Sequence, residues 1–106
     1  MVRLTVMYGQ PTDPRAFDEY YAGTHLPIAR KMRGWSRWTI EKVVAIPEQP
    51  LPPYYLIVGL YADSAEEVWR ILATPESQAA SVDVANFATG GSTSLITDVQ
   101  EIEFDA

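Results

Sequence analysis

The sequence contains no cysteine and only one histidine, His25, and these two shortages exclude several kinds of site. Without cysteine there is no disulfide framework, no thiolate nucleophile and no cysteine-based zinc or iron–sulfur site. One histidine is too few for a histidine-rich metal site, and the sequence has neither a nucleophile-elbow motif nor a glycine-rich phosphate loop. We therefore predict that the protein works without a metal, a nucleotide or another cofactor.

Positive charge and long apolar runs are also scarce. Eight Lys and Arg residues stand against fourteen Asp and Glu residues, and the net charge of −6 would mostly repel nucleic acid and anionic membranes. No stretch approaches the roughly 20 apolar residues that span a bilayer, and the N-terminus lacks the apolar core of a signal peptide. The sequence thus predicts a cytoplasmic protein whose partners include neither nucleic acid nor membrane.

Apolar and aromatic residues, by contrast, are plentiful. The hydrophobic fraction is 47%, with three Trp, six Tyr and three Phe among the 106 residues. A chain of this length has room for one domain with one core, and it contains no internal repeat or linker. We expect a single domain over residues 1–106.

Alternation and helical spacing predict the order strand, helix, strand, strand, helices, strand. The predicted strands cover residues 2–8, 35–46, 54–62 and 92–104, and the last includes Ile96, Ile102 and Phe104 in one phase. The predicted helices cover about 14–32, a segment after the capping box of Ser64 and Glu67, and 75–87. The first helix should kink or restart just after His25, because Pro27 has no backbone N–H. In the second, Ala65, Val68, Trp69 and Leu72 follow at helical spacing.

This β-α-β-β-α-β order is typical of an α+β fold with a four-stranded antiparallel sheet and helices on one face. The other face would be a large apolar patch unless a partner covers it. Its large residues would come from Trp38, Ile40, Tyr55, Ile57 and Tyr61, or from their neighbours in the opposite phase. We therefore expect a two-fold homodimer, joined sheet to sheet.

His25 is the first candidate for chemistry, because helical spacing places it on one face with Phe17, Tyr20, Tyr21 and Thr24. A histidine that is partly desolvated there would suit a general acid or base near neutral pH. The alternative is a structural histidine, bonded to a backbone carbonyl that Pro27 leaves free.

Asp83 and Asn86 form a second candidate pair, because spacing places them on one face with Ala79, Val82 and Phe87. If this helix packs beside the first, Asp83 could hold the His25 imidazole in one tautomer, while Asn86 could bond a ligand oxygen or a loop. The alternatives are a solvated Asp83 and an Asn86 that caps the helix end.

Several aromatic residues could line an apolar ligand pocket. They are Tyr8, Trp35, Trp38 and Tyr61, and the alternative is that they simply form core or dimer contacts.

The run from Phe17 to Ala29, with Gly34 after it, and the later block from Asp83 to Ala88 resemble the EthD family. The resemblance covers nearly the whole chain. It implies a ferredoxin-like domain that pairs as a dimeric α+β barrel, a cleft between helices and sheet, and a place in catabolic or polyketide-type pathways. By matched position it carries over His25 first, and then Tyr21, Asp83 and Asn86.

Two main hypotheses for function follow. In the first, the protein is an enzyme, an oxidoreductase or lyase without cofactor, that acts on a small apolar or aromatic oxygen-bearing compound. His25 is the acid or base, Asp83 orients it, and Tyr21, Tyr8, Asn86, Trp38 and Tyr61 bind the substrate. In the second, the protein is a non-catalytic ligand-binding or accessory protein of a catabolic pathway. A third possibility is that the motif only maintains the fold.

Overall fold

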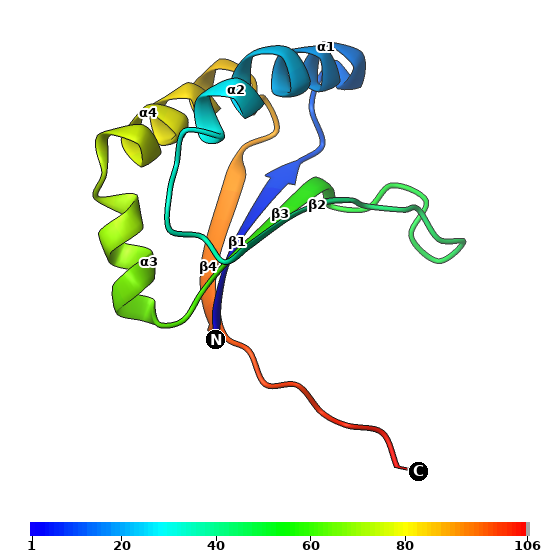
Figure 1. Ribbon diagram of the computed structural model, residues 1–106. Helices are drawn as coiled ribbons and strands as arrows, with labels where there is room; N and C mark the ends of the chain where they lie inside the picture. Colours follow the sequence, from blue (N-terminus) through cyan, green and yellow to red (C-terminus); the bar gives the residue numbers. More distant parts are fainter. Residues whose placement is uncertain (106) are drawn as a thin grey trace.

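The computed structural model describes residues 1–105 and has the predicted α+β, ferredoxin-like fold. Four antiparallel strands form one sheet in the order β2-β3-β1-β4, and the helices lie on one side of it (Figure 1). The strands are β1 (Val2–Gly9), β2 (Arg37–Lys42), β3 (Tyr54–Ala62) and β4 (Ser92–Asp98). The helices are α1 (Pro14–Tyr20), the π turn η1 (Tyr21–His25), α2 (Leu26–Ala29), α3 (Ala65–Leu72), α4 (Pro75–Asp83) and the 3₁₀ turn η2 (Val84–Asn86).

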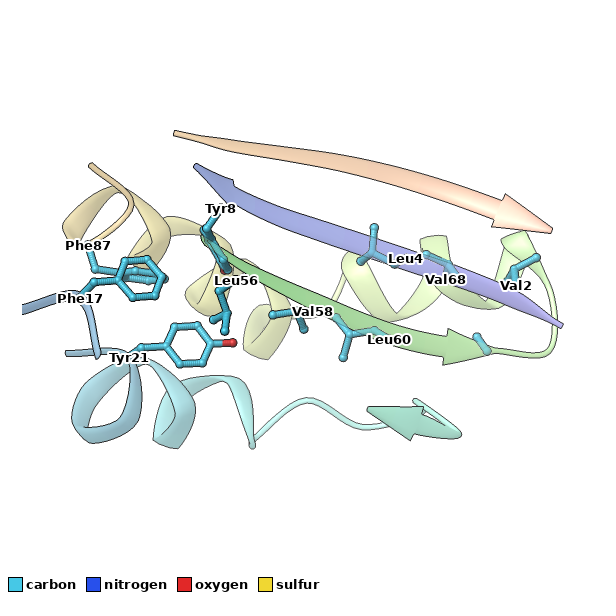
Figure 2. Close-up of a cluster of buried hydrophobic side chains, with 11 residues drawn as sticks. Val2, Leu4, Tyr8, Phe17, Tyr21, Leu56, Val58, Leu60, Val68 and Phe87 are labelled. Atoms are coloured by element: carbon cyan, nitrogen blue, oxygen red, sulfur yellow. The ribbon is translucent and has the colours of Figure 1, made fainter. Parts of the chain in front are cut away.

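The core lies between the two central strands and the helices. Alternate residues of β1 and β3 point toward the helices, as a strand period of two requires, and Val68 of α3 packs on them with no exposed surface (Figure 2). Each large apolar side chain buried in this way stabilises the fold by about 1.5–3 kcal/mol. The strand residues of this core are Val2, Leu4, Tyr8, Leu56, Val58, Leu60 and Ala62.

Local capping sets where the helices begin. The Asp13 carboxylate accepts a hydrogen bond from the backbone of Ala16, and Ser64 Oγ accepts one from the backbone of Glu67 at 3.2 Å. The Glu67 carboxylate pairs with Arg70. The apolar stripe predicted for α3 was partly wrong, because Val68 and Ile71 are buried while Trp69 is 61% exposed.

Two predicted strands were too long, and the partner strands explain why. The edge strand β2 keeps only six residues, because the proline-rich segment 43–53 makes just one isolated bridge, between Ile46 and Gln49. The last strand ends at Asp98, which pairs with Val2 at the start of β1, and beyond that pair the Val99 N–H bonds to the carbonyl of Met1, the first residue of the sequence. Beyond it the chain leaves the body of the protein as an extended segment (Figure 1).

The sheet face away from the helices has an apolar centre and a more polar border. Ile57 and Met7 lie side by side on the two central strands and Leu95 lies on the edge strand β4, all on this face, since cross-strand partners share a face. Arg3 and Glu41 form an ion pair at 2.8 Å on the β2 side. Of the candidates for this face, Ile57 and Tyr61 are on it, whereas Tyr55 lies beside a register shift in β3, packs on Phe17 and donates to Asp18 of α1. Trp38 and Ile40 face the helix side, opposite Leu60 and Val58. Within residues 1–105, no helix is both long and apolar enough to cross a bilayer.

Candidate functional site

A widened helical turn positions the histidine. Between α1 and α2 the backbone forms the π turn η1, in which the N–H of Leu26 bonds to the carbonyl of Tyr21. This is the restart expected near Pro27, and widening the turn relieves the clash that a proline ring makes with a preceding carbonyl. The buried residues are every fourth one: Phe17, Tyr21, His25 and Ala29. In a regular α-helix, residues four apart are rotated by about 40° from one another around the helix axis. The wider π turn removes part of this rotation, so the four side chains stay on one face.

His25 is bonded to a buried carboxylate from α4. Its Nδ1 lies 2.9 Å from Oδ2 of Asp83, and the two residues are only 5% and 7% exposed. The other carboxylate oxygen of Asp83, Oδ1, accepts hydrogen bonds from the Tyr20 hydroxyl at 2.6 Å and from the Asn86 amide at 3.1 Å. Both oxygens of this carboxylate are therefore satisfied, as burial of a charge requires.

These hydrogen bonds fix the protonation state of Asp83. Burial alone would raise the pKa of its carboxyl, but the hydrogen bonds from Tyr20, His25 and Asn86 outweigh burial and hold that pKa below its usual value. Asp83 is thus a carboxylate at neutral pH and can only accept hydrogen bonds, so Nδ1 of His25 must carry a proton. The other ring nitrogen, Nε2, has no hydrogen-bond partner among residues 1–105.

Aromatic rings surround the imidazole. The His25 ring centroid is 4.6 Å from that of Phe87 and 5.2 Å from that of Tyr21, and the Tyr21 ring is in turn 6.0 Å from that of Tyr8. Burial raises the pKa of Tyr21 to about 12. Burial also raises the pKa of Tyr8, as do the charges of Tyr21 and Asp83. Both hydroxyls therefore stay protonated at neutral pH, and within residues 1–105 neither has a hydrogen-bond partner.

A hollow of about 300 Å³ opens between α4 and the helix side of the sheet. Tyr8 is common to this hollow and to the cluster around His25, so the two adjoin. The walls are mostly apolar, with serine hydroxyls among them, which is the usual character of a small-molecule site. The lining residues are Leu4, Val6, Tyr8, Met32, Leu60, Leu72, Ser77, Ala80, Ser81, Val84, Ser92 and Ser94.

The structure brings together five of the seven residues predicted for the site. His25, Asp83, Asn86, Tyr21 and Tyr8 form one connected cluster. Asn86 is exposed, and its amide donates to Asp83 rather than capping the helix end; its contact with a ligand stays a prediction.

The other two predicted residues lie elsewhere. Tyr61 is on the opposite face of the sheet, where the guanidinium groups of Arg3 and Arg37 each lie 5.4 Å from its ring centroid. Trp38 lines a separate hollow with Leu26, Arg30 and Ile40. One pocket containing Tyr8, Trp38 and Tyr61 is therefore ruled out within a subunit, because strand phase assigns Tyr61 to the uncovered face.

Two members of the cluster were not predicted as site residues. Tyr20 appeared only as an aromatic on the face of His25, and Phe87 only as a neighbour of Asp83. The face predicted for α4 was also shifted by one residue, because Ala80 is buried while Ala79 and Val82 are exposed. Tyr20 and Asp83 are 63 residues apart, so their hydrogen bond depends on how α1 and α4 pack, which sequence spacing does not give.

Comparisons with known proteins agree with this fold. An uncharacterized 11.0 kDa protein of Rhodococcus erythropolis, from the thcB-thcC intergenic region, is 39% identical over 102 residues, covering 96% of this chain and 98% of the relative. The crystal structure of an EthD family protein from Bacillus halodurans has a TM-score of 0.86 at 33% identity, covering 94% and 99% of the two chains.

A more distant structure shares the fold alone. It is SnoaB, a cofactor-independent oxygenase from Streptomyces nogalater, with a TM-score of 0.64 at 15% identity, covering 95% of this chain and 94% of its own. The EthD domain profile itself matches residues 9–91, which include every residue of the cluster around His25 except Tyr8. The chain therefore belongs to the EthD family.

Proposed function

We propose that this protein binds a small apolar or aromatic molecule that carries an oxygen atom and moves a proton to or from it at Nε2 of His25. The buried hydrogen bond between His25 and Asp83 carries this proposal. Asp83 keeps the proton on Nδ1, so the lone pair of the neutral ring is on Nε2. That is the arrangement a general base needs, and the protonated ring would serve as a general acid in the reverse step.

The surroundings of His25 favour an enolisable ketone, a phenol or a quinone. An apolar hollow of about 300 Å³ suits a molecule with few polar groups. The Tyr8 and Tyr21 hydroxyls are protonated donors without a protein acceptor among residues 1–105. If Nε2 takes a proton from the carbon next to a carbonyl, negative charge develops on the carbonyl oxygen, and these hydroxyls would stabilise it.

Proton transfer is the step common to several reactions. With a phenol it would give an electron-rich phenolate, the starting point for oxidation by dioxygen without a cofactor. The shared fold with the Streptomyces oxygenase supports that variant. With a hydroxyketone the same step would start the loss of water. We also propose that residues 1–106 form a single domain. The protein would act in a catabolic pathway.

The second candidate is a ligand-binding or accessory protein without turnover. One feature favours it: among residues 1–105, Asp83 is the only carboxylate hydrogen-bonded to His25. A reaction that needs a second acid or base would have to use water or a tyrosine of raised pKa.

We also propose that the working unit is a homodimer joined through the uncovered sheet face. Ile57, Met7 and Leu95 would be covered in such a pair. A two-fold axis would place the same patch on both subunits, and the helices and the His25 site would stay on the outside of each sheet.

A ligand screen by thermal unfolding tests the proposed function. Phenols, quinones and small ketones are added to the native protein, to His25→Gln and to Tyr61→Phe, a control on the opposite sheet face. A ligand at ten times its Kd stabilises the fold by about 1.4 kcal/mol. We expect hits that stabilise the native protein and Tyr61→Phe by several degrees but stabilise His25→Gln much less. Equal shifts in all three proteins would contradict a site at His25.

Deuterium exchange then separates the two candidate functions. Each enolisable ketone among the hits is incubated in D₂O, and uptake of deuterium on the carbon next to its carbonyl is followed by mass spectrometry. An enzyme would accelerate uptake, and His25→Gln would lose the acceleration. Binding without any acceleration would favour the accessory role.

A further inference from the structure

The chain carries an extended C-terminal arm, residues 100–105, that leaves the body after β4 (Figure 1). Within residues 1–105 the arm makes no hydrogen bond or ion pair with the rest of the chain. Ile102 is 75% exposed and Phe104 is fully exposed. Burying each of these side chains would stabilise the protein by about 1.5–3 kcal/mol. A surface that covers the arm would therefore bind it favourably.

The arm has the pattern of a strand with two unlike sides. Its apolar residues alternate with the acidic residues Glu101, Glu103 and Asp105, so an extended backbone would present Ile102 and Phe104 on one side and three carboxylates on the other. A complementary surface therefore needs an apolar hollow, basic groups and, for the backbone, an unpaired strand edge.

The edge of β2 offers these three features together. β2 is an outer strand of the sheet, so one side of its backbone is unpaired. Next to it is a hollow of about 220 Å³ lined by Leu26, Arg30, Trp38 and Ile40, which we name the β2-edge hollow. An apolar cavity of roughly 150 Å³ is enough for a benzene ring, so an aromatic side chain fits this volume.

The β2-edge hollow also has unused polar groups. Arg30 forms no ion pair with any of residues 1–105, and neither do the nearby Lys31 and Arg33. Nε1 of Trp38 is buried and has no acceptor in the part of the chain that the structure describes. The hollow is therefore basic and has a free donor, whereas the arm is acidic.

The arm of the same subunit is badly placed to fill this hollow. β4 and β2 are opposite edges of the sheet, three strand spacings or about 14 Å apart. The arm runs out on the side of the sheet that no helix covers, whereas the hollow is on the helix side (Figure 1). A second subunit packed on the uncovered face would meet the arm directly, and an extended segment of six residues, up to about 20 Å long, could pass round the outer edge of the partner's β2 to its helix side.

We propose that the C-terminal arm of one copy docks on a second copy of this chain, with Phe104 in the partner's β2-edge hollow and the acidic residues of the arm, which face away from the hollow, beside Arg30 at its exposed rim. This inference rests on the proposed homodimer and adds to it a specific receptor and a specific anchor.

Directed disulfide formation tests the contact, because the chain has no cysteine of its own. Phe104→Cys protein is mixed with an equal amount of isotope-labelled Ile40→Cys protein under mild oxidation, and the mixed disulfide is measured by mass spectrometry. Val82→Cys replaces Ile40→Cys in the control, since Val82 is 76% exposed on α4. We expect at least tenfold more mixed disulfide with Ile40→Cys. Equal yields, or no mixed product with Ile40→Cys, would overturn the inference.

A charge reversal tests the same contact without new cysteines. Arg30→Glu should weaken dimerisation in sedimentation at low salt by at least about tenfold, and Glu103→Arg in the same chain should restore much of the loss. Failure of that rescue would contradict the predicted pairing. Dimeric native protein with equal disulfide yields would refute only the arm, whereas a native protein of single-chain mass would refute the arm and the homodimer together.

Discussion

Asp83 is the residue on which the geometry of the site depends, because it accepts hydrogen bonds from three side chains at once. Tyr20→Phe removes one of these donors and leaves the ring in place. We predict that the pKa of Asp83 rises toward its usual value, since a hydrogen bond to the charged form is lost. Carboxyl NMR titration measures this change. Tyr55→Phe is the matched control, because the Tyr55 hydroxyl donates at 2.8 Å to Asp18, and it should leave Asp83 unchanged.

The same carboxylate should make stability depend on pH. The pKa of Asp83 is lower in the folded chain than its ordinary value of 3.8, so its ionised form stabilises the fold above that pH. This contribution is lost as the pH falls through the folded pKa. Urea unfolding of native protein and Asp83→Asn should therefore show a difference in unfolding free energy that is constant above about pH 5 and shrinks as the pH falls below the ordinary pKa of 3.8. A difference that stayed constant at low pH as well would show that the charge of Asp83 does not matter.

Replacing His25 itself should cost stability as well as ligand binding. His25→Gln removes a buried hydrogen bond from Asp83 while Tyr20 and Asn86 still donate to it. We predict a loss of about 1–3 kcal/mol in the unfolding free energy by urea titration. A change near zero would mean that the imidazole is not held as the structure has it.

Among the elements, the helical stretch from Pro14 to Ala29 was predicted only in part. Pro27 predicted the restart, but nothing in the spacing predicted a π turn rather than a kink. The positions of β1 and β3 followed from their alternating apolar residues. The ends of β2 and β4 did not, because a strand ends where its neighbour stops pairing, and that depends on register across the sheet.

The site shows the same division between local pattern and packing. His25, Asp83 and Tyr21 were found because motif residues and helical faces are local properties. Tyr61 and Trp38 were assigned to the site because they are aromatic. The strand phase puts Tyr61 on the opposite face of the sheet, and Trp38 lies at the β2 edge, away from His25. Tyr20 was missed as a partner of Asp83, because only the packing of two distant helices creates that contact.

Gly23 lies in the middle of the π turn and tolerates a side chain there. Its φ angle is negative, and a Cβ built there meets no atom of residues 1–105 within 4 Å. Gly23→Ala should therefore stabilise the fold by about 0.5–1 kcal/mol, because glycine loses more backbone freedom on folding. Urea unfolding measures this gain. Destabilisation would mean that the turn needs glycine for a contact made only in the assembled protein.

For the whole molecule, the uncovered sheet face decides the assembly. Ile57 lies near its centre, so Ile57→Glu would place a charge inside the proposed dimer interface. We predict that the dissociation constant rises at least tenfold in analytical ultracentrifugation, while the circular dichroism spectrum stays the same. Val82→Glu adds the same charge to the helix layer and should leave the mass unchanged. If Ile57→Glu were as dimeric as native protein, the interface would lie elsewhere.

The proposed chemistry depends on Asp83 holding the proton on Nδ1 of His25 and leaving Nε2 for a ligand. Nitrogen-15 NMR tests it directly, because a chain with one histidine gives one pair of ring signals. We predict that the neutral form of the ring carries its proton on Nδ1 and that the Nε2 signal moves when a ligand from the thermal screen is added. A neutral form with its proton on Nε2, or an Nε2 signal that no stabilising ligand changes, would contradict this arrangement.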